Sequence, residues 1–176
     1  MNSYESFDQN IETFNETGDL SEYVWGTEIS GFENNKAVAD FVRQEIPLTH
    51  LDAVSDISYN KFTVFNTDTE LANIGEINRD VAAHIGLEYY NDSKDGMATP
   101  EWTAFNKLPD LVRVYEANDM PISACRLESA NLTRGENFAH VYATYIESPH
   151  TLKAMAPEHY NFMRDNVFYG REYTDA

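Results

Sequence analysis

Large apolar residues recur at every third or fourth position near the start of the chain, which is the spacing of one face of an α-helix. This stripe consists of Tyr4, Phe7, Ile11 and Phe14. Carboxylates follow the same spacing beside it, at Glu5, Asp8, Glu12, Glu16 and Asp19. Because Ser3 suits the N-cap and Gly18 suits the position after the last turn, the pattern predicts an acidic amphipathic helix over residues 3–18.

Helical spacing returns in two segments of the first half of the chain. Residues 34–46 predict a short helix that stops before Pro47. Residues 67–86 predict the clearest helix of the chain, with Gly86 as its C-terminal stop. The expected caps are Asn34 or Asn35 for the first helix and a capping box of Thr67 and Glu70 for the second. The expected inward residues are Val38, Phe41 and Val42 in the first helix and Leu71, Ile74, Ile77, Val81 and Ile85 in the second.

Two helical segments are expected in the second half. Residues 99–109 predict one or two helical turns, with Thr99 as the cap and with Trp102 and Phe105 facing inward. Residues 157–170 predict a final helix, which has proline in its first turn and glycine after its last.

Alternation of apolar and polar residues predicts four strands. They cover residues 57–65, 110–116, 122–129 and 137–147. Taken with the helices, this order predicts an α+β fold: an antiparallel sheet with helices packed on one side, preceded by an acidic amphipathic N-terminal helix. We therefore expect an acidic arm over residues 1–35 and a single α+β domain over residues 36–176.

The charge is strongly negative and unevenly distributed. The chain has 30 acids and 12 bases, a net charge of −18, and its first 35 residues hold eight of the acids and no base. Such a balance argues against direct binding of nucleic acid or of anionic membranes, and favours a basic protein surface or neighbouring subunits as partners. High negative charge also aids solubility, an explanation that needs no partner.

The sequence predicts a soluble protein of a reducing compartment, either the cytoplasm or a virion. It has no apolar run as long as a membrane span and no charged-then-apolar leader. The lone Cys125 excludes an intramolecular disulfide framework.

Two interpretations of the N-terminal helix stay open. In the first, its apolar stripe packs on the domain's own core and its acids face water. In the second, the stripe and the acids dock together on a basic partner. The candidate partner-binding residues are Glu5, Phe7, Asp8, Ile11, Glu12, Phe14, Glu16 and Asp19.

The pattern of histidines and carboxylates predicts no metal site. His140, His150 and His159 lie within twenty residues, with Glu147 and Glu158 among them. Zinc and iron sites usually take two ligands from a close local pair, whereas these histidines are ten and nine residues apart. The sequence also has no nucleophile elbow, P-loop or dinucleotide-binding motif, so we predict no catalytic residue and no cofactor.

One family resemblance rests on the order of elements from Lys61 to Ile146. The stretch VRVYEANDMPISACRLES is similar to the second and third strands of the acetyltransferase fold that uses acetyl-CoA. That family follows its fourth strand with a glycine-rich loop whose backbone amides hold the pyrophosphate. Here the corresponding segment, ESPHTLKAMAPEHY, has no glycine. The resemblance therefore implies a degenerate, non-catalytic relative that does not bind acetyl-CoA.

Three functions follow as hypotheses. The first is a non-catalytic, acidic protein-interaction subunit, such as a structural or assembly component of a phage virion. The second is a DNA-mimic inhibitor of a host nucleic-acid-binding or restriction enzyme, and the third is the degenerate acetyltransferase-like domain. Bases such as Arg43 and Arg113 interrupt the rows of acids that a DNA mimic needs.

Overall fold

The computed structural model describes residues 21–58, 74–93, 99–119 and 132–175. The predicted N-terminal helix and all eight of its candidate partner-binding residues lie outside these ranges. So do the capping box of Thr67 and Glu70, the predicted strand 122–129 and Cys125. The chain divides into two compact units, residues 1–85 and 86–176.

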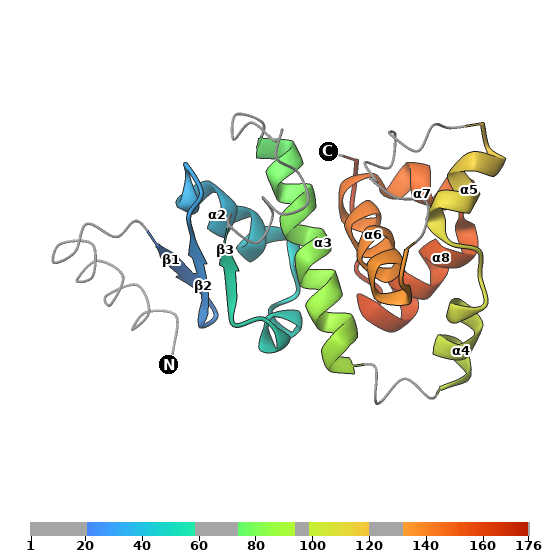
Figure 1. The fold of residues 1–176 in the computed structure, drawn as a ribbon, viewed down its shortest axis with the longest axis horizontal. Coiled ribbons are helices and arrows are strands. Elements are labelled where there is room, and N and C mark those ends of the chain that lie inside the picture. The colour runs from blue at the N-terminus through green and yellow to red at the C-terminus, as the bar shows by residue number, and fades with distance from the viewer. Residues whose placement is uncertain (1–20, 59–73, 94–98, 120–131, 176) are drawn as a thin grey trace, which may run out of the picture. The chain divides into compact units, whose positions relative to one another are not determined.

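The described part of the first unit is a small sheet with helices (Figure 1). Strands β1 (Glu22–Val24) and β2 (Thr27–Ser30) form a hairpin, and helix α2 (Asn35–Glu45) and the 3₁₀ helix η1 (Leu48–Ala53) lead to β3 (Asp56–Ser58). The prediction of mixed α and β structure is confirmed. The prediction of a purely antiparallel sheet is wrong, because β1 pairs with β2 antiparallel whereas β2 pairs with β3 parallel. A helical crossover such as α2–η1 is the usual connection between parallel strands.

Helix α2 forms as its sequence predicts. The side chain of Asn34 accepts a hydrogen bond from the Ala37 amide at 3.0 Å, and the helix ends at Glu45, before Pro47. Of its predicted inward residues, Val38 and Val42 are fully buried and Phe41 is half-buried. Apolar side chains of the sheet complete this core, namely Val24, Ile29 and Ile57.

Helix α3 (Ile74–Ser93) runs across the boundary between the two units, and the predicted stop at Gly86 is wrong. Within the second unit Gly86 faces Tyr142, and a Cβ atom at Gly86 would lie 2.8 Å from the Tyr142 Cγ atom. This glycine therefore permits close helix packing rather than ending the helix. Of the predicted inward residues, Ile77, Val81 and Ile85 are buried.

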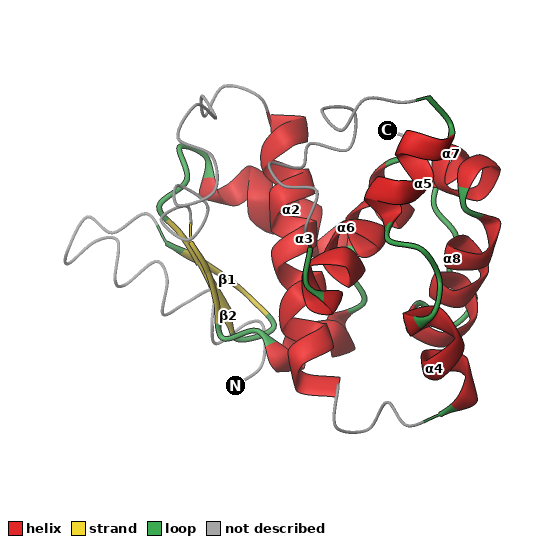
Figure 2. Cartoon of the chain, turned by 45° about the vertical axis from the view of Figure 1, so that its right-hand side comes forward, coloured by secondary structure: helices red, strands yellow, loops and turns green. Residues whose placement is uncertain are grey.

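The described part of the second unit is helical (Figure 2). Its helices are α4 (Pro100–Asn106), α5 (Leu111–Ala117), α6 (Arg134–Glu147), α7 (Pro149–Met155) and α8 (Pro157–Phe162), followed by the π-helical turn η5 (Met163–Val167). The predicted cap of α4 is confirmed, because the Thr99 side chain accepts a hydrogen bond from the Trp102 amide and both Trp102 and Phe105 are buried. The final predicted helix is confirmed over residues 157–167.

Two predicted strands of the second unit are helices. Residues 110–116 fall largely in α5, whose buried residues Leu111, Val112 and Tyr115 have helical spacing. Residues 137–147 lie in α6, which begins at a capping box of Thr133 and Glu136. Nearly every residue of α6 from 137 to 146 is buried, so the polar face that reveals a surface helix is absent from the segment.

These helices stand where the acetyltransferase resemblance requires strands. Its second and fourth expected strands, residues 112–116 and 137–147, are helical. No helix of the described residues is long and apolar enough to cross a membrane.

Candidate protein-interaction site

The turn between β1 and β2 contains a tryptophan whose backbone has a positive φ, which is unfavourable for this residue type. Val24 pairs with Thr27, so Trp25 and Gly26 form a two-residue turn. Their φ angles are 54° and 82°, as a type I′ turn requires, and Asn-Gly is the preferred sequence for this turn. A left-handed backbone at a non-glycine residue costs about 1–2 kcal/mol. The side chain of Trp25 nevertheless lies in the open, with an exposed fraction of 54%.

Hydrogen bonds join the hairpin to the end of η1 and to the residues between η1 and β3. The indole Nε1 of Trp25 donates to Asp52 Oδ1 at 3.3 Å. The Thr27 hydroxyl donates to the Val54 carbonyl at 2.7 Å, and the Glu28 amide donates to the Ser55 carbonyl at 3.2 Å. The turn is therefore held in place although its aromatic ring is exposed.

The outward face of the sheet is polar and acidic. Tyr23 pairs with Glu28, and Glu28 pairs with Asp56, so one row of side chains crosses all three strands. All three residues are half-exposed. Two like charges directly opposite each other destabilise a sheet, and the Glu28 carboxylate makes no ion pair with a described residue.

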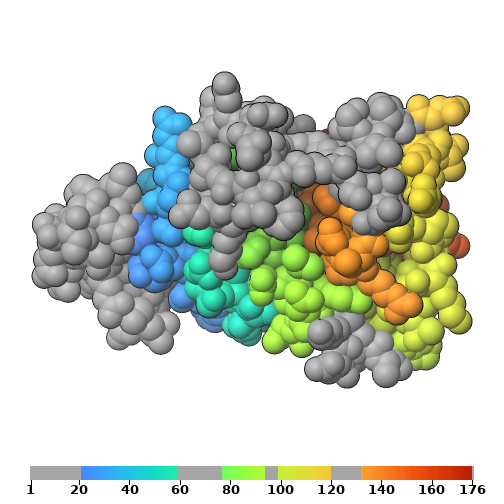
Figure 3. Space-filling model, in the orientation of Figure 1, coloured from blue at the N-terminus to red at the C-terminus, as the bar shows by residue number. Residues whose placement is uncertain are grey.

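We call this row and the turn beside it the hairpin site. It consists of Tyr23, Trp25, Glu28, Asp52 and Asp56. The space-filling view in Figure 3 shows the hairpin (blue) next to the chain that leads into β3 (teal) on one face of this unit.

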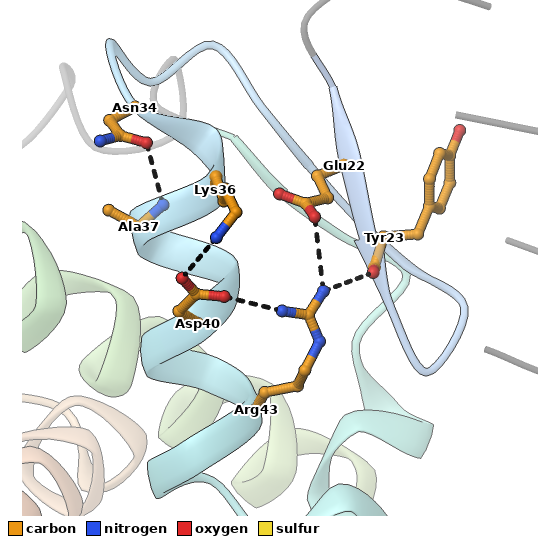
Figure 4. A network of polar contacts seen from close by, with 7 residues as sticks. All are labelled: Glu22, Tyr23, Asn34, Lys36, Ala37, Asp40 and Arg43. Carbon is orange, nitrogen blue, oxygen red and sulfur yellow. Dashed lines mark hydrogen bonds and ion pairs between the residues drawn. The ribbon is translucent and has the colours of Figure 1, made fainter. Parts of the chain in front are cut away.

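The two bases within residues 21–58 lie on α2, which packs on the other face of the sheet (Figure 4). Lys36 Nζ lies 3.2 Å from Asp40 Oδ2. Arg43 contacts Asp40 at 2.9 Å and Glu22 at 3.5 Å, and also donates to the Tyr23 carbonyl. These bases already have acidic partners, so they do not neutralise the hairpin site.

The three histidines of the sequence pattern, His140, His150 and His159, all lie within the described residues. No group of three potential ligands that could hold a metal ion occurs among the described residues. His159 has an exposed fraction of 3%, and its Nε2 donates to the Pro109 carbonyl at 2.8 Å. Burial lowers the pKa of His159, although this hydrogen bond and the carboxylates of Glu158 and Asp110 act in the opposite direction. His150 is exposed, and its amide donates to Asp175 Oδ1 at 3.0 Å.

Tyrosines of the second unit hold the C-terminal residues in place. The Tyr145 hydroxyl donates to the Arg171 carbonyl, and the Tyr160 hydroxyl donates to Glu172 Oε1 at 2.7 Å. Desolvation, with smaller effects of the Glu172 carboxylate, raises the pKa of Tyr160 to about 12. These contacts hold Arg171 and Glu172 against α6 and α8.

The hairpin site was not predicted from the sequence. Its signal was the alternation in EYVWGTEIS, in which apolar residues lie on either side of a Trp-Gly pair. Trp-Gly is not a standard hairpin signal, because tryptophan disfavours positive φ. The eight residues that were predicted to bind a partner lie outside the described ranges, and their role stays a prediction.

The chain matches no family model, no curated protein and no solved structure. Its function therefore has to be inferred from its own residues.

Proposed function

We propose that the chain is a non-catalytic, acidic subunit that binds a basic protein surface within a larger assembly, such as a phage particle. The observation that carries this proposal is the outward row of Tyr23, Glu28 and Asp56, beside the exposed Trp25. An exposed aromatic ring on an acidic surface can gain both apolar burial and charge pairing from a basic partner.

The distribution of charge between the two units supports the same partner. Residues 1–85 hold 16 acids and 4 bases, a net charge of −12. Residues 86–176 hold 14 acids and 8 bases, a net charge of −6. The first unit therefore has twice the negative charge in slightly fewer residues. A field of this kind steers a cationic partner toward the first unit and repels nucleic acid.

Zero-length cross-linking of the native complex tests the proposal. A carbodiimide joins a carboxylate to a lysine amine only where the two groups are in contact. We expect cross-links from the partner's lysines to Glu28, Asp52 or Asp56, and to acids of residues 5–19 if the N-terminal helix also docks. Acids of the second unit, such as Glu101 and Glu158, are exposed and serve as internal controls.

Two results would contradict the proposal. One is a set of cross-links confined to the second unit. The other is a partner that proves to be a nucleic-acid-binding enzyme held through its DNA-binding groove, which would favour the DNA-mimic function instead.

A further inference from the structure

We propose that Trp25 and Asp52 together bind an arginine side chain of the basic partner. This inference rests on the proposed function and deepens it, because it names the contact and the chemical group. The exposed indole face would take the guanidinium by a cation–π contact, and the carboxylate would take its N–H groups.

The geometry prepares both groups for such a ligand. The indole N–H holds Asp52 Oδ1 at 3.3 Å, which fixes the carboxylate at the edge of the ring. The second oxygen, Asp52 Oδ2, accepts no hydrogen bond from the residues that the structure describes. A group that is already oriented loses less conformational freedom on binding than a mobile side chain does.

The surroundings favour a cation over other ligands for an exposed tryptophan. Glu28 and Asp56 lie on the outward face of the adjoining strands, and Asp52 itself is exposed. The Asp52 carboxylate at the ring and the net charge of −12 on residues 1–85 repel the phosphates of nucleic acid and the head groups of anionic lipids. Arginine fits better than lysine, because its planar guanidinium stacks on an aromatic face and offers a fork of donors to a carboxylate.

The backbone indicates that Trp25 is not present for the sake of the turn. With φ of 54° at Trp25 and 82° at Gly26, the turn would be more stable with asparagine before glycine. Strained residues of this kind cluster at functional sites, where another role maintains them.

A labelled peptide of alternating arginine and glycine provides the test, with a matched lysine peptide. Binding to the full chain is measured by fluorescence anisotropy at low ionic strength. We expect Trp25→Asn to weaken binding of the arginine peptide by at least about tenfold and Asp52→Asn by about fivefold, since desolvated cation–π and charge-assisted contacts have this size. The matched control is Glu33→Gln, which removes one negative charge from an exposed position outside the hairpin site and should leave binding within about twofold of the wild-type value.

Direct contact is read from the tryptophan itself. The chain has two tryptophans, and Trp102 is buried in the second unit, so a Trp102→Phe background isolates the emission of Trp25. We expect the arginine peptide to change that emission. If this background does not fold, calorimetry on the wild-type chain with both peptides measures the same preference.

Each other outcome overturns the arginine site. Equal binding by the wild-type chain, Trp25→Asn and Asp52→Asn would show that the peptide binds acids elsewhere, and the proposed function would stand. Equal affinity for both peptides would remove the preference for arginine. A shift of Trp25 emission with phosphatidylcholine vesicles, without peptide binding, would identify a lipid contact. The proposed function is judged separately, by the cross-links to the native partner.

Discussion

Trp25 combines an unfavourable backbone conformation with an exposed side chain. A substitution at this residue should therefore change the stability of the fold and the proposed binding in opposite directions. Its φ of 54° favours asparagine or glycine, and its main polar contact is one hydrogen bond to the exposed Asp52. Replacing it should relieve the backbone without opening the core, because the Trp25 side chain is exposed whereas its neighbours Val24 and Thr27 are the buried residues of the turn.

Trp25→Asn should therefore raise the melting temperature by about 2–4 °C, the shift that about 1 kcal/mol gives in a chain of this size. Gly26→Ala is the control in the same turn: an added Cβ meets no atom within 4 Å, but φ is 82°, so the substitution should lower the melting temperature. Calorimetric melting of the three proteins measures both changes. A lower melting temperature for Trp25→Asn would mean that the indole is part of the fold and not a binding group.

His159 gives a pH dependence whose sign follows from its burial. Because its pKa is lowered in the folded protein, the unfolded chain binds the proton more readily as the pH falls through the ordinary value of 6.5. The contribution of neutral His159 to the free energy of unfolding is fully present well above pH 6.5 and is lost as the pH falls toward the lowered pKa. His159→Gln keeps a donor for the Pro109 carbonyl but does not titrate. Denaturant unfolding at pH 7.5 and pH 5.5 should show a smaller loss of stability for His159→Gln than for the wild type, and equal losses would rule out this role.

At the scale of elements, the close approach of α3 to α6 within the second unit depends on Gly86. A Cβ there would lie 2.8 Å and 2.9 Å from Cγ and Cβ of Tyr142, atoms near the backbone that cannot easily move. Gly86→Ala should destabilise the protein by about 1–2 kcal/mol, because overpacking outweighs the gain in helix propensity.

Gly135→Ala is the matched control for this contact. It adds the same methyl group to α6, but its nearest neighbours are the Leu87 Cδ1 atom at 3.0 Å and the Tyr90 ring at 3.2 Å, which are side-chain ends that can shift. We expect an effect within about 1 kcal/mol. Urea unfolding compares the two variants, and an equal or smaller loss for Gly86→Ala would contradict the proposed packing.

The elements that the sequence predicts well are helices with a side-chain N-cap and a solvent-exposed face. Helices α2 and α4 have side-chain caps at Asn34 and Thr99 and mix buried with exposed positions. Helix α6 reads as a strand in sequence because nearly all of its sides are buried, so that its apolar residues show no helical period. Gly86 reads as a helix stop because a glycine needed for close packing and a glycine that ends a helix look the same in sequence.

Of the hairpin site, the sequence predicts the negative charge but not which residues come together. The excess of acids in the first half of the chain is visible from composition. The meeting of Trp25 with Asp52, 27 residues apart, depends on the parallel pairing of β2 with β3, which brings the end of η1 beside the turn. No local pattern contains that information.

At the scale of the whole molecule, a net charge of −18 makes association with a basic partner sensitive to salt. The first unit carries two thirds of this charge and the hairpin site, so most of the steering should come from residues 1–85. The cation–π contact proposed for Trp25 would be less sensitive to salt than pairs of exposed charges are, because it excludes water. The complex should therefore weaken steadily with ionic strength rather than dissociate at a single low concentration.

Sedimentation velocity of the chain isolated from its native source shows whether the chain is held in a larger assembly. The chain alone has a mass of 20.1 kDa. We predict that at low salt it sediments in a complex well above this mass, and that the single chain is released as salt approaches about 1 M, where the screening length falls to about 3 Å. Sedimentation as a 20.1 kDa monomer at low salt would contradict the proposed function.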